Sequence, residues 1–327
     1  MPKHHIPAIE NALSAALAHY EETMGEAFPV VPELLPVEDD EFWGVAEAKG
    51  DTVSISVSTG IVQTLTDLWD KAADDTDLLN GVGNPFQIDN NEMVHLGLVW
   101  LMLHELHHFQ MGHFVFTGKL SLTEANAPKR YGVAQRASTQ VSAYDHIPEE
   151  DWPKVEPCLE LQADHDAMEM LIDAYSKDGW EIIRTRTAAI SAMMMLIERE
   201  DTKRDSPGTS HPKAATRIFQ LLGHVIEMPL IQAKLAQARP EQNLDSAIPP
   251  DEEQSAYNRE VTIPSFFDAV NLARIVDTDT IREDLGEAQD FFQDVHVAKL
   301  GDPEQFQHLM TEGAVQWGEL ILLNRRL

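Results

Sequence analysis

The sequence predicts an α+β protein that is predominantly helical and carries one small β-sheet. Apolar residues recur at helical spacing in most segments of the 327-residue chain. The segment Thr52–Ser58 instead alternates cleanly between small polar and apolar side chains, which predicts a β-strand. The chain contains no internal repeat and no low-complexity tract. A helical core with a small sheet beside it is an α+β arrangement.

The first third of the chain is expected to contain a helix, a hairpin and two further helices. Residues 6–24 place Ile6, Ile9 and Leu13 on one side of an amphipathic helix, and a proline-containing loop follows it. The strands 42–48 and 52–58 flank a Lys-Gly-Asp turn and predict a β-hairpin. Helices are then expected over 61–73 and about 92–112, with an acidic loop between them.

The rest of the chain is expected to be helical apart from three segments. Residues 114–155 mix glycine, proline, serine and charges, which indicates irregular structure or short helices. The polar segment 201–210 is expected to be a loop, and 239–260 an acidic, proline-containing linker. Helices are predicted over 157–175, 180–200, 211–238, 264–276, 278–299 and 303–325.

The composition narrows the classes of binding partner and the cellular compartment that we expect for this protein. Lys and Arg number 24 and Asp and Glu 55, so the net charge is 24 − 55 = −31. Such a surface repels phosphate backbones and anionic membranes, so we expect no nucleic-acid partner and no membrane insertion. The single cysteine, Cys158, excludes a disulfide within the chain, and the first residues lack the apolar core of a signal peptide. We therefore expect a soluble, cytoplasmic protein, and the oligomeric state stays open.

The segment His104-Glu105-Leu106-His107-His108 satisfies the pattern H-E-x-x-H. Residues four apart lie on one face of a helix, so His104 and His108 can point their imidazoles at one cation. Glu105 can reach a water molecule on that cation, which is the chemistry of zinc-activated water. The alternative is a histidine-rich helix end exposed to solvent, while His107 and His113 are expected to be ordinary structural histidines.

A catalytic zinc site needs a third protein ligand. Extending the motif with x-x-G-x-x-H fails, because Met111 and Phe114 occupy those positions. Glu160 is the best alternative, with Asp164 four residues later on the same helical face to orient a ligand histidine. The same spacing equally fits a solvated acidic stripe, and Glu124 is a rival third ligand.

Three segments together resemble the metallopeptidase family that contains HtpX, BepA and the CAAX prenyl endopeptidases. They are HELHH, ELQAD and the segment from Ser210 to Ile218 that begins Ser-His-Pro, in the family's order. The Gly112-His113 pair is also similar in style to intracellular Lit-like phage-exclusion peptidases. The resemblance covers about 104–218. It implies a zincin-like metallopeptidase domain, which we place over 1–238. The resemblance says nothing about residues 240–327, where the composition predicts an acidic, proline-containing linker or loop over 239–260 and a C-terminal helical region over 261–327.

Chemistry and resemblance together assign roles to the site residues. One Zn²⁺ per chain is expected on His104, His108 and Glu160, with Glu105 as general base. His211 is the first choice for stabilising the oxyanion or approaching the metal. The other expected roles are Asp164 as a partner of a ligand histidine, Arg217 beside the oxyanion or pinning the two carboxylates, Tyr131 and Tyr144 as further candidates, and Ser54 and Ser56 on a strand that pairs with the substrate.

These roles predict a zinc-dependent endopeptidase that hydrolyses peptide bonds of a protein or peptide substrate. Two other functions stay open on the sequence. One is a zinc aminopeptidase, which would need acidic groups to receive a free amine. The other is a catalytically silent metallopeptidase-like module that binds or regulates a partner, although a purely structural zinc has no use for Glu105.

Overall fold

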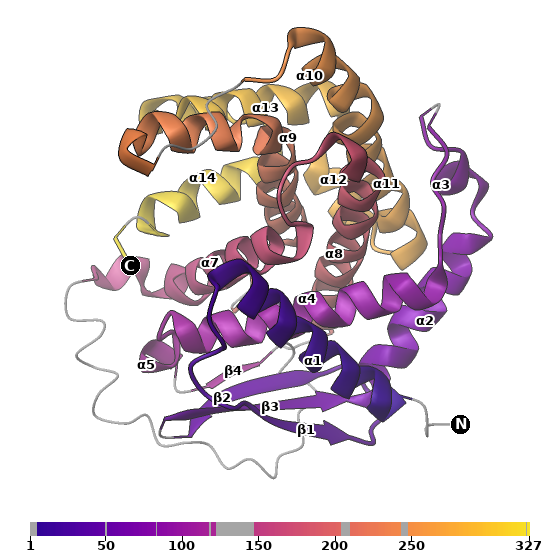
Figure 1. Ribbon diagram of the computed structural model, residues 1–327, viewed down its shortest axis with the longest axis vertical. Coiled ribbons are helices and arrows are strands. Elements are labelled where there is room, and N and C mark those ends of the chain that lie inside the picture. Colours follow the sequence, from indigo (N-terminus) through magenta and orange to yellow (C-terminus); the bar gives the residue numbers. More distant parts are fainter. Residues whose placement is uncertain are drawn as a thin grey trace.

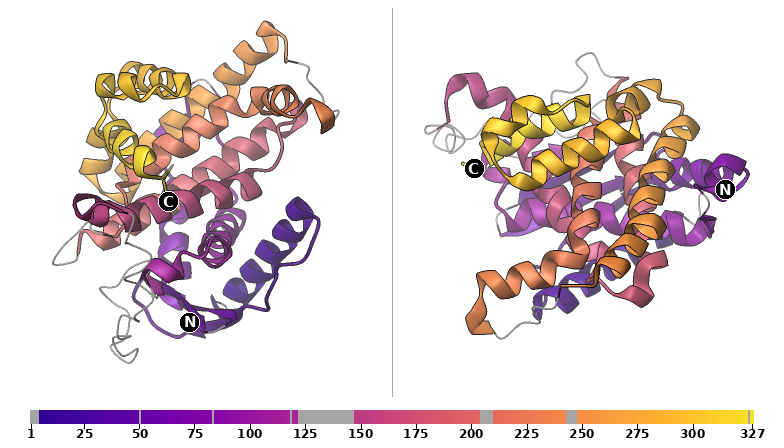
Figure 2. Two further views of the ribbon diagram at one scale, coloured as in Figure 1. Left: turned by 90° about the vertical axis from the view of Figure 1, so that its left-hand side faces the viewer. Right: turned by 90° about the horizontal axis from the view of Figure 1, so that it is seen from above.

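The chain is described by a computed structural model over residues 5–49, 51–82, 84–117, 119–121, 147–203, 210–242, 248–324 and 326–327. Figure 1 shows the sheet and α1 (His5–Met24) on one side of α4 (Asn90–Gln110). The helices α7 (Trp152–Ile172) and α8 (Trp180–Asp201) lie on the other side, with the C-terminal helices beyond them. The two further views show the same layering (Figure 2). The predicted class, predominantly helical with a small sheet, is confirmed.

The N-terminal part forms the sheet and its covering helices. The predicted hairpin is present as β2 (Gly44–Lys49) and β3 (Thr52–Ser58), which pair antiparallel. The strand order is β1-β3-β2-β4, so β3 lies inside the sheet. β1 (Glu33–Val37) pairs parallel with β3 and occupies the segment that the sequence predicts as a loop. Its Pro36 is compatible with a strand because β1 is at an edge, where a missing N–H costs no ladder hydrogen bond.

Two long helices flank the sheet as the sequence predicts. They are α1 (His5–Met24) and α2 (Thr59–Ala73), and the short α3 (Thr76–Asn80) follows α2 within the expected acidic loop.

The helix α4 (Asn90–Gln110) runs through the centre of the fold (Figure 1). Its residues from Leu96 to His108 are all buried, which is typical of a central helix rather than a surface one. Asp89 caps its start by accepting hydrogen bonds from the N–H groups of Asn91 and Glu92. The predicted motif helix is therefore confirmed, and the exposed-helix alternative is wrong.

The middle of the chain supplies the helices that face α4. After α5 (Phe114–Thr117) and β4 (Lys119–Ser121), the elements are α7 (Trp152–Ile172), α8 (Trp180–Asp201) and α9 (Ala214–Ala238). The helix α7 begins five residues before its predicted start at Pro157. A proline in the first turn of α7 suits a helix start, and the helix continues through Pro157.

The segment after α9 is more ordered than expected. The linker prediction is wrong over its second half, where α10 (Asp251–Tyr257) and a π-helical turn (Asn258–Thr262) lead into α11 (Ile263–Val276). Tyr257 explains this order, because its side chain is buried and its hydroxyl donates to the carbonyl of Val225 on α9 at 2.9 Å.

The C-terminal helices are shorter than the two predicted ones. Gly286, with φ of 71°, separates α12 (Asp279–Leu285) from α13 (Ala288–Leu300). A 3₁₀ helix (Pro303–His308) precedes α14 (Glu312–Asn324). One hydrophobic core cluster runs from Ile9 to Ala314, so these helices share the core of the preceding residues. The division of the chain at 239–260 into regions stays a prediction.

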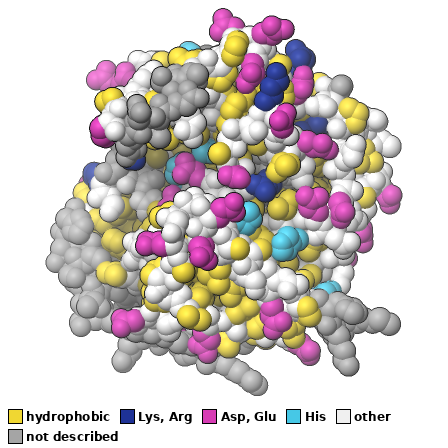
Figure 3. All heavy atoms as spheres, viewed as in Figure 1, with side chains coloured by type: hydrophobic (Ala, Val, Ile, Leu, Met, Phe, Trp, Pro, Cys, Tyr) yellow, Lys and Arg dark blue, Asp and Glu magenta, His cyan; other side chains and the backbone are white. Residues whose placement is uncertain are grey.

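Two surface properties complete the fold. Among the described residues, none of the helices combines the length and the apolar character needed to cross a membrane. Acidic side chains are spread over the face seen in Figure 3, where basic side chains are few.

Candidate metal centre

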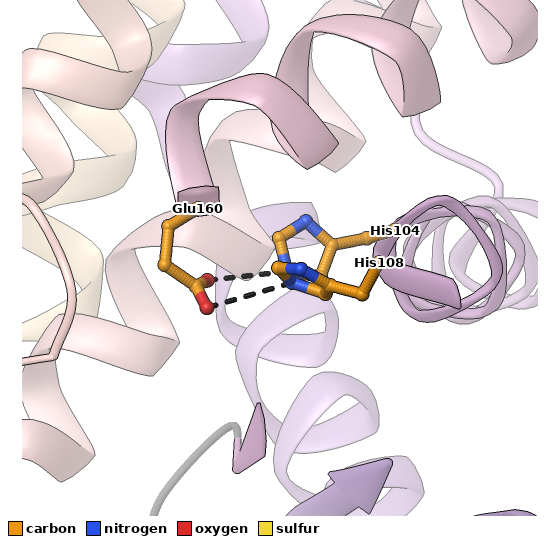
Figure 4. A group of neighbouring side chains, drawn as sticks. All are labelled: His104, His108 and Glu160. Carbon is orange, nitrogen blue, oxygen red and sulfur yellow. Dashed lines mark hydrogen bonds and ion pairs between the residues drawn. The ribbon is translucent and has the colours of Figure 1, made fainter. Parts of the chain in front are cut away.

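The helices α4 and α7 bring His104, His108 and Glu160 together in the interior (Figure 4). The Nε2 atoms of the two histidines are 2.9 Å apart. Glu160 Oε2 lies 3.2 Å from Nε2 of His104, and Glu160 Oε1 lies 3.5 Å from Nε2 of His108. Ligands about 2.0–2.1 Å from a tetrahedral zinc are about 3.4 Å from one another. The three donor groups therefore converge at the spacing of a metal site.

The surroundings of the three groups also fit a bound cation. All three side chains are buried, where a carboxylate is costly unless it is paired or coordinates a metal. Oε2 of Glu160 has no hydrogen-bond partner in the described part of the chain. Two imidazoles and a carboxylate form the ligand set of a catalytic zinc site with an open position.

Asp164 and Arg217 hold His104 in place. Asp164 Oδ1 lies 3.0 Å from Nδ1 of His104, on the side of the ring away from the other ligands. The guanidinium of Arg217 grips the same carboxylate with two hydrogen bonds, Nε to Oδ2 at 2.7 Å and Nη2 to Oδ1 at 2.6 Å. Both side chains are fully buried. Arg217 thus binds Asp164, which is one of the two carboxylates that it was expected to pin.

His113 does the same for His108, which the sequence did not suggest. Gly112, with φ of 74°, turns the chain so that the N–H of His113 donates to the carbonyl of His108 at 3.0 Å. The Nδ1 atoms of the two rings are then 2.8 Å apart, and Nε2 of His113 lies 2.9 Å from Oε1 of Gln162. The Gln162 amide reaches Asn324 at the end of α14. The Gly112-His113 pair right after the motif was the signal for this contact.

One set of protons satisfies the whole chain of contacts. If Nε2 of His108 faces a cation, its Nδ1 carries the proton and donates it to Nδ1 of His113. His113 then donates from Nε2 to Gln162, whose amide N–H donates to Asn324. The C-terminal helix α14 therefore supports the tautomer that His108 needs as a ligand.

Glu105 is buried beside the ligands, with an exposed fraction of 3%. Its Oε2 also lacks a hydrogen-bond partner within the described residues. Burial raises the pKa of this carboxyl to about 7, against the opposing effect of His104. A carboxyl with a pKa near neutrality can both accept and release a proton there.

The ligand carboxylate and histidines are strongly coupled. Burial disfavours the charged form of Glu160, but neighbouring histidines, His211 foremost, hold the pKa of its carboxyl well below the ordinary value. Burial likewise disfavours a charged His104, yet Asp164 and Glu160 outweigh it and raise the pKa of His104 to about 10. In the metal-free site, the ionised carboxylates of Glu160 and Asp164 are thus balanced by positive charge on the histidines and on Arg217.

His211 approaches the site from the segment before α9. Its Nε2 lies 3.4 Å from Oε2 of Glu160, and its Nδ1 lies 2.9 Å from the hydroxyl of Ser210. The side chain is buried. The sequence-based placement of His211 close to the ligands agrees with these distances.

Ser54 and Ser56 are the predicted site residues that the structure contradicts. They lie on β3, which pairs with β1 on one side and β2 on the other, so its backbone is not free to pair with a substrate. Both side chains are buried. The prediction was wrong because alternation identifies a strand but not its position within a sheet.

Other predicted residues do not contact the ligands or fall outside the structure. His107 packs against Met170, with 3.3 Å between Nε2 and Sδ, which agrees with its structural role. Glu124, Tyr131 and Tyr144 lie outside the described residues.

Comparisons of the chain with protein-family models, with curated proteins and with solved structures gave no match. The assignment of a function therefore rests on the chemistry of this site.

Proposed function

We propose that this chain is a zinc-dependent endopeptidase with a zincin-like core. The observation that carries the proposal is the buried convergence of His104, His108 and Glu160, beside Glu105, whose Oε2 has no hydrogen-bond partner among the described residues. This arrangement contains the parts that hydrolysis of a peptide bond by activated water requires: a ligand set, a base and a nearby donor.

His104, His108 and Glu160 would hold the ion, and Asp164 and His113 would orient the two imidazoles. Zinc at such a site supplies a Lewis acid that acidifies water and polarises a carbonyl group. The buried pairing of Asp164 with Arg217 fixes His104 before any substrate arrives. This preorganisation lowers the cost of placing the reacting groups.

Glu105 would accept a proton from the attacking water and later deliver it to the leaving amine nitrogen. Its side chain is buried, and within the described part of the chain its Oε2 has no hydrogen-bond partner that would compete for this proton. General acid–base catalysis of this kind contributes about 10²–10⁴ in rate.

His211 would stabilise the negative charge that develops on the carbonyl oxygen. If Nδ1 accepts a hydrogen bond from the Ser210 hydroxyl, the neutral ring carries its proton on Nε2, which lies on the side of Glu160. Loss of one such donor costs about 10²–10³ in turnover in other acyl-transfer enzymes.

The same geometry bears on the alternatives. A catalytically silent module would have no use for the buried Glu105, because a carboxylate oxygen such as its Oε2, which lacks a hydrogen-bond partner among the described residues, destabilises the fold. No observation on the described residues favours an aminopeptidase over an endopeptidase.

The test combines metal content with hydrolysis. Purified chain is reconstituted with zinc, and bound metal is measured by elemental mass spectrometry for wild type, Glu160→Ala and Glu105→Gln. Cleavage is then followed on an unfolded protein substrate by mass spectrometry of the products. We expect about one tightly bound zinc in wild type and Glu105→Gln, markedly less in Glu160→Ala, and cleavage by wild type alone.

Two results would reject the proposal. A wild-type chain that takes up no zinc at this site, even in excess metal, would remove the metal-dependent chemistry. A Glu105→Gln variant as active as wild type would show that the observed cleavage does not use this base.

A further inference from the structure

A second group of metal-ligating side chains lies on the opposite face of α7. Glu160 and Asp164 point toward α4, whereas His165 and Glu169 are four residues apart on the far side of the helix. His224 on α9, seven residues after Arg217, projects toward them. The pair of helices α7 and α9 thus carries two separate sets of histidine and carboxylate groups.

The distances within this group are those between ligands of one ion rather than those of hydrogen bonds. Glu169 Oε1 lies 3.6 Å from Nε2 of His165 and 3.7 Å from Nδ1 of His224. Separations of that length are too long for a hydrogen bond. They are close to the spacing of about 3.4 Å between ligands of a tetrahedral zinc. The donor atoms of all three groups lie within 4.8 Å of one another.

The group opens into a cavity of about 640 Å³. All three residues lie on its wall, together with Gln162 and apolar side chains that include Phe219 and Trp317. His165 and Glu169 are half-exposed, with side-chain exposures of 47% and 49%, while His224 is 9% exposed. A cation held there would keep coordination positions open to solvent and to molecules in the cavity.

We propose that His165, Glu169 and His224 form a second site for a transition-metal ion, in the wall of this cavity. Two imidazoles and one carboxylate favour Zn²⁺, Ni²⁺ or Cu²⁺ over the oxygen-seeking Mg²⁺ and Ca²⁺. The site is expected to be weaker than the buried one, because two of its ligands are half-exposed side chains that lose conformational freedom on binding. Local spacing in the sequence cannot bring His165 and His224 together, since they are 59 positions apart, counted as 224 − 165.

The site is distinct from the buried centre but adjacent to it. Gln162 lines the cavity and also accepts the hydrogen bond from His113, which in turn contacts His108. The proposal does not depend on catalysis, and its outcome is separate from that of the proposed peptidase activity.

The experiment is isothermal titration of the metal-free chain with Zn²⁺, and with Ni²⁺ as a second probe. Wild type is compared with His224→Ala, Glu169→Gln and the control His296→Ala, which removes an exposed histidine outside the group. Glu169→Gln changes a half-exposed side chain, so it keeps the test valid if His224→Ala does not fold. Glu160→Ala removes the buried site and isolates the second one.

We expect wild type to bind a weaker equivalent that Glu160→Ala and His296→Ala retain, and that His224→Ala and Glu169→Gln lose. The proposal is overturned if wild type has no such weaker equivalent, or if Glu169→Gln binds it as His296→Ala does. Neither result depends on whether the buried centre holds zinc or cleaves peptides, because the comparison concerns the weaker equivalent alone.

Discussion

The buried ion pair between Arg217 and Asp164 offers the sharpest test of how this site is built. Replacing Arg217 with methionine removes both hydrogen bonds to Asp164 but keeps an apolar side chain against Trp100, over whose ring the guanidinium lies. The Asp164 carboxylate is fully buried and would retain only His104 as a charged neighbour. Breaking a buried pair in this way costs about 3–5 kcal/mol.

That loss is large but measurable, because whole domains are stable by about 5–15 kcal/mol. We expect the free energy of unfolding of metal-free Arg217→Met to fall by about 3–5 kcal/mol in urea, with an unchanged denaturant slope. Zinc affinity should also fall by about 10–100-fold, because Asp164 no longer holds His104 firmly.

The chain contains a matched control. Arg184 forms the same two-bond pair with Asp268, at 2.6 and 2.9 Å, in an equally buried place between α8 and α11. Arg184→Met should destabilise the protein by at least as much, because Arg184 also donates from Nη1 to the carbonyl of Asn84 at 2.9 Å, and it should leave zinc affinity unchanged. If Arg217→Met is as stable as wild type and binds zinc equally well, the role assigned to the Arg217–Asp164 pair is wrong.

Three further predictions follow from the same structure. His113→Ala removes the partner of His108 and should weaken zinc binding by about 10–100-fold in a competition titration with a chelator, whereas wild-type affinity would refute the proton arrangement. Gly60→Ala should destabilise the fold, since a Cβ at this position meets the backbone oxygen of Glu41 at 2.4 Å. Gly223→Ala has open space around its Cβ, so in the same unfolding measurement in urea it should be neutral or stabilising by up to about 1 kcal/mol. Burial alone would raise the pKa of Asp164, but Arg217 keeps it below the ordinary 3.8. The stability that this pair contributes is therefore complete above pH 3.8 and is lost as the pH falls through the lower folded-state pKa. Acid unfolding of the metal-free wild type should show this loss, and Arg217→Met should lack it.

The correct sequence-based predictions about the site came mostly from patterns within a single helix. The spacing of His104 and His108 is a property of one helix and is present, and that helix begins after the capping Asp89 and ends just before Gly112. The four-residue spacing of Glu160 and Asp164 likewise survives folding, because it also lies within one helix. Such features follow from the 3.6-residue period and from the chemistry of helix ends, so the chain need only be helical for them to appear.

Tertiary packing decided what local patterns could not. Whether β3 is an edge or an inner strand depends on β1, a strand that pairs with it from a proline-containing segment. The partnership of His113 with Gln162 and Asn324 joins positions up to 211 residues apart, counted as 324 − 113.

Tertiary packing also limits how far residue spacing in the sequence can identify the ligands of the site. The sequence brought His104 and His108 together because one helix holds both, and it offered Glu160 only as one of two candidates for the third ligand. The choice between a ligand and a solvated acidic stripe depends on which face of α7 meets α4. That is a matter of burial, since an ionised carboxylate placed in the interior must find a positive partner or a metal.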